Sequence, residues 1–510
     1  MKNLAILLLA LAAVLISSCN DKEQSPQIDL NDLSIAAIHD AYRAGDYNCR
    51  ELTQACIDRI KKYDSTLNAI SYINHDALET AVELDREYNE TGVLRPLHGI
   101  PLLVKDNINT AGMPTTAGSL ALENFIPGED AFIIKKLVEA GAVIIGKTNM
   151  AEWAFSPMHT ESSTAGTTRN PYNTDYVPAG SSGGTAAGIA ADMGTAGLGT
   201  DTGNSIRGPS SHCALVGFRT TMGLVSRSAI IPLYLRNDVV GPMCRSVEDA
   251  TRVLQVIAGY DPADPLTEHS KGNIPGNYTD YLQKDGMQGA RIGVLGILSN
   301  DNPDPEIREL FEQAVEDMRS LGAEVINPVD IPRFEELSAN QWCSMFKNDV
   351  EDYLEQYVQN DTMQTIEDII EAGSKSEFAA SRLKESAQFE GRYGNSNIPC
   401  LDAFNDERRI AFRRAIEDVM DSLQLDALVY PSWNNKPAHI DAFMDEYKGD
   451  NSQVIAPHTG QPAFTVPMGY TGENLPAGLQ FLGRMFDEAT LIRLTYAYEQ
   501  GTQHRRPPEL

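Results

Sequence analysis

The sequence has few basic residues for its length. Among its 510 residues, 41 are Lys or Arg and 71 are Asp or Glu, so the formal net charge is −30. A surface of this charge repels phosphate backbones and anionic lipid headgroups. The composition therefore argues against nucleic-acid partners and against a membrane contact made through a basic face.

Cysteine and histidine are also scarce. The seven cysteines form no Cys-x-x-Cys pair, and the nine histidines are scattered singly. The sequence therefore predicts no metal site and no cofactor. Apart from Cys19, six cysteines remain, an even number that permits disulfides in an exported protein. Six free thiols are the simpler interpretation, because a chain this long can build its core without disulfides.

Long hydrophobic runs are absent except at the N-terminus, where Leu4 to Ile16 are apolar without interruption. A helix of that length spans about 20 Å, too short for a bilayer core of about 30 Å, so residues 1–18 are predicted to be a signal peptide. The following Ser-Ser-Cys19 resembles the lipobox of bacterial lipoproteins, with Ile16 in place of the usual Leu. We expect lipidation at Cys19, a polar tether over residues 19–31 and a position in the bacterial cell envelope, at the periplasmic face or outer membrane. A plain secretory signal is the alternative.

Strand and helix patterns alternate along the rest of the chain. Buried-type strands are predicted at residues 99–105, 142–145, 290–297, 323–331, 426–432, 463–470 and 477–484. Helical patterns are predicted at residues 32–63 (as two helices), 75–88, 131–140, 306–321 and 404–423. This alternation predicts an α/β fold with one large mixed, twisted sheet covered by helices on both faces. No linker divides residues 32–510, so we expect a single α/β/α domain.

Residues 335–371 interrupt this alternation of strands and helices. They hold ten acidic residues and one base, Lys347, and their pattern is helical. We expect a helical insertion over about 335–400 that covers the sheet edge and shapes the substrate entrance.

Residues 162–223 are rich in Gly, Ser, Thr and Ala. A structureless loop of this length is rare inside a domain. Small side chains at this density instead indicate backbone that packs against backbone or ligand and presents its amide groups.

Two familiar motifs in this region do not fit their usual context. Residues 141–148 match the phosphate-loop string, but the residues between the glycines, Ala-Val-Ile-Ile, are a strand rather than an anion-binding turn. Residues 180–184 match the Gly-x-Ser-x-Gly elbow around Ser182, but no apolar strand precedes it.

A third arrangement fits better, with Lys105 at the end of a buried strand, Ser181 in AGSSGG and Ser205 in DTGNSIRG. A serine hydroxyl needs a base to become a nucleophile, and a lysine is a base only when it is uncharged. Burial lowers a lysine pKa, and a second serine can relay the proton. The N–H groups of Thr202, Gly203 and Asn204 are predicted to form the oxyanion hole.

These residues and several further motifs resemble the amidase signature family. The likeness includes residues 95–107 (RPLHGIPLLVKDN), 140–155, 179–210 and 460–484, with a signature core over about 95–250. The resemblance implies that Lys105 is the base, that Ser181 bridges through a cis peptide and that Ser205 is the acylated nucleophile. It also implies the single α/β/α domain.

Two positions differ from the family pattern. Ala179 and Asn204 stand where the family has glycine. Asn tolerates a positive φ better than most residues, so the turn before Ser205 can form. Beside it we predict an ion pair between Asp201 and Arg207, and a packed, hydrogen-bonded pair of His212 and Cys213.

The sequence therefore predicts an exported, lipid-anchored amidase that hydrolyses a carboxamide or N-acyl amide bond through an acyl-serine intermediate. Its partner would be a small-molecule amide or a short peptide amide, with no nucleic acid and no membrane contact beyond the anchor. The alternatives are an A-type amidotransferase subunit that uses charged tRNA and a non-catalytic binding protein on the same fold. The sequence sets neither the amide nor the oligomeric state.

Overall fold

The structure, a computed structural model, describes residues 28–343, 345–389 and 400–510. The predicted signal peptide and Cys19 lie outside the described residues. Within the described ranges, no helix is long and apolar enough to cross a membrane.

In the part of the chain that the structure describes, eleven strands form one mixed sheet in the order β1-β3-β2-β6-β8-β7-β12-β13-β11-β9-β10. The strands are β1 (Ile70–Ile73), β2 (Pro101–Lys105), β3 (Val143–Thr148), β6 (Ala196–Asp201), β7 (Val216–Arg219), β8 (Val239–Cys244), β9 (Arg291–Leu295), β10 (Glu324–Val329), β11 (Ala427–Pro431), β12 (Ala463–Tyr470) and β13 (Pro476–Leu482). Parallel pairs lie on both sides of an antiparallel centre, and β4 (Glu161–Ser162) and β5 (Gly166–Thr167) form a separate small sheet. All seven strands predicted from the sequence are present, and the mixed sheet is confirmed.

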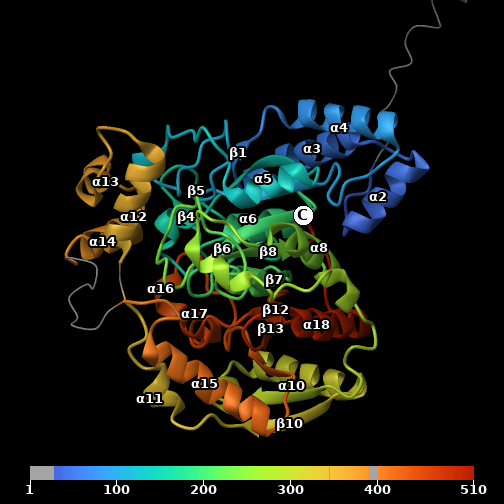
Figure 1. Cartoon of the computed structure of the whole chain (residues 1–510), viewed down its shortest axis with the longest axis vertical. Coiled ribbons are helices and arrows are strands. Elements are labelled where there is room, and N and C mark those ends of the chain that lie inside the picture. Colours follow the sequence, from blue (N-terminus) through green and yellow to red (C-terminus); the bar gives the residue numbers. More distant parts are fainter. Residues whose placement is uncertain (1–27, 344, 390–399) are drawn as a thin grey trace, which may run out of the picture.

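Helices cover the sheet, which runs along the long axis of the molecule (Figure 1). The first group is α2 (Ile35–Ala44), α3 (Cys49–Leu67), α4 (Ala77–Thr91), α5 (Phe132–Glu139), α6 (Gly183–Ala190), α7 (Arg207–His212), α8 (Val247–Ile257), α9 (Gly296–Ser299) and α10 (Pro305–Ser320). The second group is α11 (Phe334–Ser338), α12 (Phe346–Tyr353), α13 (Ile366–Ala372), α14 (Glu377–Ser386), α15 (Glu407–Ser422), α16 (Phe443–Glu446), α17 (Ala456–Thr459) and α18 (Glu488–Thr502).

The side chains of β11 show that both faces of the sheet are buried. Ala427 and Val429 belong to the largest hydrophobic core, whereas Leu428 and Tyr430 belong to a second core that contains Phe412 of α15. Successive side chains of a strand point to opposite faces, so one core lies on each side of the sheet. The predicted α/β/α layering is therefore confirmed.

The Gly- and Ser-rich region is almost entirely buried from residue 176 onward. It forms α6, β6, α7 and β7, and it brings backbone into close contact with backbone. A Cβ atom added to Gly180 would lie 2.3 Å from the carbonyl oxygen of His159, and one added to Gly184 would lie 2.2 Å from that of Asn149. Only glycine fits at such distances, so the small residues allow this packing.

Residues 335–371 are largely helical, as the pattern predicts. The short helix α11 packs against the edge strand β10, because Phe334 and Leu337 belong to the core that contains Val329, but α12–α14 pack elsewhere. Residues of α12, α13 and α14 form a core with Trp153 and Phe155, which follow β3, and with Leu122, which follows β2. The edge strands β1 and β10 contribute nothing to that core. The expected position over the sheet edge therefore holds for α11 and is wrong for α12–α14, which stand together at one side of the molecule (Figure 1).

Candidate active site

Lys105 lies at the end of β2 and is completely buried. Because β2 pairs in parallel with β6, with Val104 opposite Leu198, the lysine lies beside the end of β6. Its Nζ donates hydrogen bonds to the Ser181 Oγ at 2.7 Å and to the Thr200 Oγ1 at 2.8 Å. Burial lowers the pKa of Lys105 to about 7, although the Asp201 and Asp238 carboxylates act to raise it. A lysine of this kind is substantially uncharged at neutral pH.

Ser181 is fully buried in the segment that leads into α6, and the Gly180–Ser181 peptide bond is cis. The neighbouring Ser182 is also buried, and its Oγ donates to the carbonyl oxygen of Thr200 at 3.3 Å. No sheet strand directly precedes Ser182, which the hydrolase elbow would require. The geometry therefore distinguishes the two adjacent serines, because only Ser181 contacts the lysine.

Residues 202–205 form the turn between β6 and α7, which we call the oxyanion turn after the role that the sequence predicts for it. Within the described part of the chain, no protein acceptor takes the N–H groups of these four residues. The hydroxyl of Ser205 likewise has no hydrogen-bond partner among the described residues, and the serine lines a cavity. The structure thus joins Lys105 to Ser181 directly and places Ser205 in the wall of the cavity, without a hydrogen bond between the two serines.

Buried ion pairs stabilise the oxyanion turn. Asp201 forms buried ion pairs with Arg207 at 3.1 Å and with Arg219 at 2.8 Å, which confirms the predicted Asp201–Arg207 pair. Burial alone would raise the pKa of Asp201, but the two guanidinium groups lower it to about 2. Arg207 also donates to the carbonyl oxygen of Gly203 at 2.6 Å. The ion pairs leave the N–H groups of the turn available for a ligand.

Asn204 lacks the positive φ that was expected for it, whereas Ala179 has a positive φ. Asn204 does not adopt a positive φ, so the reason expected for an Asn at this position does not apply. Its side chain donates to the carbonyl oxygen of Pro157 at 3.2 Å across the cavity wall. Ala179 has φ 60°, a left-handed conformation that the glycine of the family pattern would adopt more easily.

The predicted pair of His212 and Cys213 is packed but not hydrogen-bonded through the imidazole. His212 is buried, and neither ring nitrogen has a partner within the described residues. Its ring lies against that of Trp433, with centroids 4.5 Å apart. Burial lowers the pKa of His212 to about 3, so the imidazole is neutral.

The phosphate-loop string is a strand, as its sequence indicates. Residues 143–148 form β3, and the buried Lys147 Nζ donates to the Thr115 Oγ1 at 2.8 Å. The Lys147 amine is therefore hydrogen-bonded inside the protein and is not available to bind a phosphate.

The cavity beside Ser205 has a volume of about 750 Å³. One wall is the oxyanion turn, and the others come mostly from apolar and aromatic side chains. These include Phe155, Met158, Leu233, Trp342, Phe378 and Phe389. A cavity of this size, with a few polar groups on one side, is typical of a small-molecule site. Within the described ranges, no group of His, Cys, Asp and Glu side chains could hold a metal ion.

Cys343 and Cys400 form a disulfide, so the expectation of six free thiols is wrong for this pair. Cys49, Cys56, Cys213 and Cys244 are free and buried. The bond joins residues 57 positions apart, and Cys343 lines the cavity. Sequence spacing carried no signal for it, because the fold alone brings the two cysteines together.

Sequence reasoning also missed three polar residues that support the site. Thr200 accepts from Lys105, Arg219 pairs with Asp201, and Asp238 accepts from the Thr202 hydroxyl at 2.5 Å. Arg219 offered a usable signal, since it is the only charged residue in the apolar strand β7.

Comparison with known proteins agrees with this geometry. The family model described as Amidase matches residues 51–492. A peptide amidase from Stenotrophomonas maltophilia is similar to the chain, with 37% identity, 93% of this chain and 98% of that chain covered, and a TM-score of 0.82. An A-type subunit of glutamyl-tRNA(Gln) amidotransferase from Synechococcus is 34% identical over 499 residues, covering 93% of this chain and 99% of the relative. A peptide amidase in complex with the competitive inhibitor chymostatin gives a TM-score of 0.80 at 36% identity, with 94% of this chain and 99% of that chain covered.

The mixed sheet, the buried lysine and the cavity thus belong to an enzyme of the amide-hydrolysing class. The chain is a member of the amidase family, also called the amidase signature family.

Proposed function

We propose that the protein hydrolyses a carboxamide or N-acyl amide bond through an acyl intermediate on Ser205, with Lys105 as the base and Ser181 as the proton relay. The observation that carries the proposal is the 2.7 Å hydrogen bond from a fully buried lysine to Ser181, beside a cavity lined by Ser205. The unpaired amides of the oxyanion turn support it, because residues 202–205 line the same cavity and could donate to a developing negative charge.

The proposed reaction begins with neutral Lys105. The lysine takes the proton of Ser181, Ser181 takes the proton of Ser205, and the Ser205 oxygen attacks the substrate carbonyl carbon. The carbonyl oxygen becomes an anion that accepts hydrogen bonds from the oxyanion turn, each worth about 2.7–4 kcal/mol in the transition state. The proton returns through Ser181 to the leaving nitrogen, the C–N bond breaks, and water then hydrolyses the ester by the same route.

A primary carboxamide or short peptide amide is the substrate class that we propose. The likeness to peptide amidase over nearly the whole chain supports it, as does the cavity volume of about 750 Å³. Measuring the release of ammonia or amine from a panel of primary, aryl and N-acyl amides tests the class. Release from none of them would contradict the proposal.

The rate should depend on pH through Lys105. The uncharged amine is the active form, so kcat/KM should be level above a pH of about 7 and fall about tenfold per pH unit below it. Initial rates with a substrate that does not ionise between pH 5 and pH 9 measure this profile.

Asp450 provides the control, since burial raises its pKa to about 7 as well. This residue lies beside the cavity and contacts Gln453. Asp450→Asn should retain the decline below pH 7. A profile that is flat from pH 5 to pH 8 in the wild-type enzyme contradicts the role of Lys105.

The second candidate is an A-type amidotransferase subunit, and the likeness to such proteins over 93% of the chain favours it. The net charge of −30 argues against contact with tRNA. Co-purification with partner subunits and charged tRNA would support this candidate, whereas amide hydrolysis by the isolated chain supports the amidase. The third alternative is a non-catalytic binding protein. If it is correct, a fluorophosphonate probe should leave Ser205 unlabelled.

We further propose that the protein is exported and anchored in the bacterial cell envelope through lipid on Cys19. The apolar run of residues 4–16 and the Ser-Ser-Cys that follows support this proposal. Cys19→Ser should move the protein from the membrane fraction to the soluble fraction, which cell fractionation and immunoblotting detect. Membrane association that is unchanged in this variant would contradict the anchor.

A further inference from the structure

Trp342 differs from the other two tryptophans of the chain in its exposure. Trp153 is 1% exposed and Trp433 is 5% exposed, whereas Trp342 is 45% exposed and lines the cavity. A large aromatic ring left open to solvent inside a cavity is available to a ligand. Burying its free face against an apolar group would stabilise the complex.

The ring of Trp342 lies against the oxyanion turn. A Cβ atom placed on Gly203 would be 3.1 Å from its Cη2 atom, so the indole packs closely on this glycine. The ring also meets that of His458 edge to face, with centroids 4.5 Å apart. Trp342 therefore lies beside the turn that carries Ser205. There it would contact the substrate group that is attached to the carbonyl under attack.

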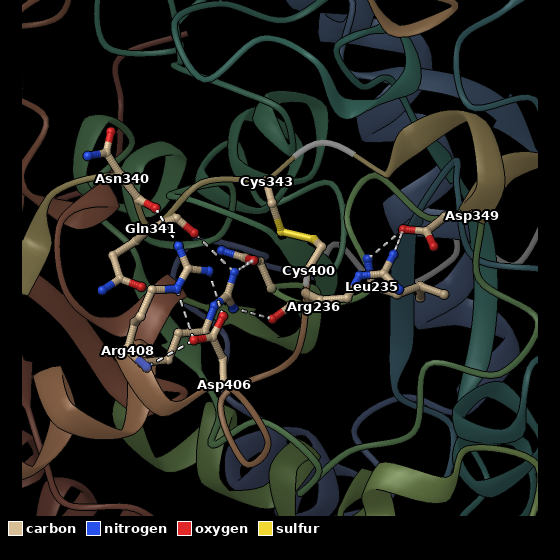
Figure 2. The surroundings of a disulfide bond; sticks show 11 residues. Leu235, Arg236, Asn340, Gln341, Cys343, Asp349, Cys400, Asp406 and Arg408 are labelled. Atoms are coloured by element: carbon tan, nitrogen blue, oxygen red, sulfur yellow. Dashed lines mark hydrogen bonds and ion pairs between the residues drawn. A yellow bond between two sulfur atoms is a disulfide. The ribbon is translucent and has the colours of Figure 1, made fainter. Parts of the chain in front are cut away.

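The backbone around Trp342 is not held by a helix. Residues 339–343 lie between α11 and α12. On one side, Arg408 donates to the carbonyl oxygen of Asn340 at 3.1 Å and Arg409 to that of Gln341 at 3.3 Å. On the other side, the disulfide ties Cys343, the residue next to Trp342, to Cys400 (Figure 2).

Helix α12, which follows this segment, also contacts a second segment of the cavity wall, whose Tyr234 ring meets that of Trp342 edge to face with centroids 6.4 Å apart. Arg236 forms an ion pair with Asp349 of α12, and Asp349 also accepts from the N–H group of Leu235 at 3.1 Å (Figure 2). Leu233 and Tyr234, just before these residues, line the cavity. The disulfide at Cys343 and the Asp349 contacts therefore both tie the chain just after Trp342 to other parts of the protein.

The chemistry of the cavity is apolar around Trp342. Among its described lining residues, Arg382 alone carries a charge, and it is paired with Glu385 at 2.6 Å. A charged group on the substrate would lose its hydration here without gaining an unpaired charged partner. An aromatic or bulky aliphatic group would instead pack against the apolar wall.

We propose that Trp342, positioned by the Cys343–Cys400 disulfide, selects amides that carry an aromatic or bulky apolar group next to the scissile carbonyl. The proposal rests on the proposed amidase function and adds the specificity of its cavity. Trp342 is the specificity-determining side chain, and the disulfide acts through it as a positioning element.

Kinetics with a matched pair of substrates test the role of Trp342. For N-acetylphenylalaninamide, Trp342→Ala should raise KM about tenfold with kcat changed less than about threefold, because one aromatic contact is lost. For N-acetylalaninamide the KM should change less than about threefold, and Trp342→Phe should restore most of the discrimination. An equal change of KM for both substrates, or no change for either, would overturn the proposal.

Fluorescence gives a test that does not depend on turnover. In a Ser205→Ala background, N-acetylphenylalaninamide should shift tryptophan emission to shorter wavelength by covering Trp342, and adding Trp342→Phe should remove the shift. A shift that survives Trp342→Phe overturns the proposal. If the shift is lost in Trp342→Phe but the wild-type enzyme hydrolyses no amide, the proposed function fails and recognition by Trp342 stands.

Reduction tests the disulfide. Dithiothreitol supplies two electrons and two protons, so the disulfide becomes two thiols and the reagent becomes its cyclic disulfide. Native-state alkylation and peptide mapping verify reduction at Cys343, which lines the cavity, whereas Cys400 and the four free cysteines of the described residues are buried. Reduction should increase quenching of Trp342 by acrylamide and raise KM for N-acetylphenylalaninamide several-fold.

The double variant Cys343→Ser/Cys400→Ser is the matched control. Without reductant, it should already show the KM and acrylamide quenching of the reduced wild-type enzyme, and dithiothreitol should change neither value. Verified reduction of the wild-type enzyme that alters neither quenching nor KM would overturn the positioning role. Circular dichroism at the assay temperature establishes that each preparation compared is folded.

Discussion

Replacing Ser205 by alanine is expected to reduce amide turnover by at least about a thousandfold, because no acyl intermediate can form without the hydroxyl. The residue is 4% exposed and its hydroxyl has no hydrogen-bond partner within the described residues, so alanine should fit without disturbing the fold. Turnover of a primary amide and labelling by a fluorophosphonate probe measure the loss. Wild-type-like turnover in this variant would contradict the proposed mechanism.

Two neighbouring serines provide matched controls for this experiment. Ser182→Ala removes a buried hydrogen bond to the carbonyl oxygen of Thr200, worth about 1 kcal/mol, and should leave the rate within about tenfold of wild type. Ser181→Ala should lower the rate strongly and leave residual activity, because the nucleophile remains but its relay is lost. A larger loss in Ser182→Ala than in Ser205→Ala would favour the Gly-x-Ser-x-Gly elbow.

Replacing Asp201 by asparagine is expected to cost about 3–5 kcal/mol of folding stability, since it leaves Arg207 and Arg219 buried without their shared counter-charge. All three side chains are fully buried. Denaturation in urea, followed by circular dichroism, measures the free energy of unfolding.

Asp40 offers a control on the surface. Its ion pair with Arg43 is 2.8 Å long, but the two side chains are 78% and 58% exposed. Asp40→Asn should therefore change stability by less than about 1 kcal/mol. If Asp201→Asn changed stability as little as Asp40→Asn, the buried ion pairs would not be what holds the oxyanion turn.

The parts of the site that could be predicted from the sequence are those formed by residues close together in the chain. Lys105 follows an apolar strand, and the oxyanion turn follows β6, so each was recognisable from a few adjacent residues. The Asp201–Arg207 pair was also predictable, because its two residues flank one turn.

What could not be predicted depends on contacts between distant segments. Trp342 meets Gly203 although the two are far apart in the sequence, and the backbone just before it is held by Arg408 and Arg409, which are distant from both. The disulfide has the same origin, since its cysteines are 57 residues apart. Asn204 shows a third limit, because its φ is not positive and its side chain donates to the carbonyl oxygen of Pro157, a residue 47 positions away.

The division between the sheet and the helices α12–α14 has a consequence for how this enzyme can be altered. The proposed reacting groups lie on β2, on the segment before α6 and after β6, whereas Trp342, Phe378 and Phe389 come from a separate stretch of the chain. Exchanging residues 339–389 together with Cys400 for the equivalent stretch of a relative would therefore replace one part of the cavity wall and leave the lysine and both serines in place. Such a chimaera is a direct route to new amide preferences in a chain whose chemistry stays the same.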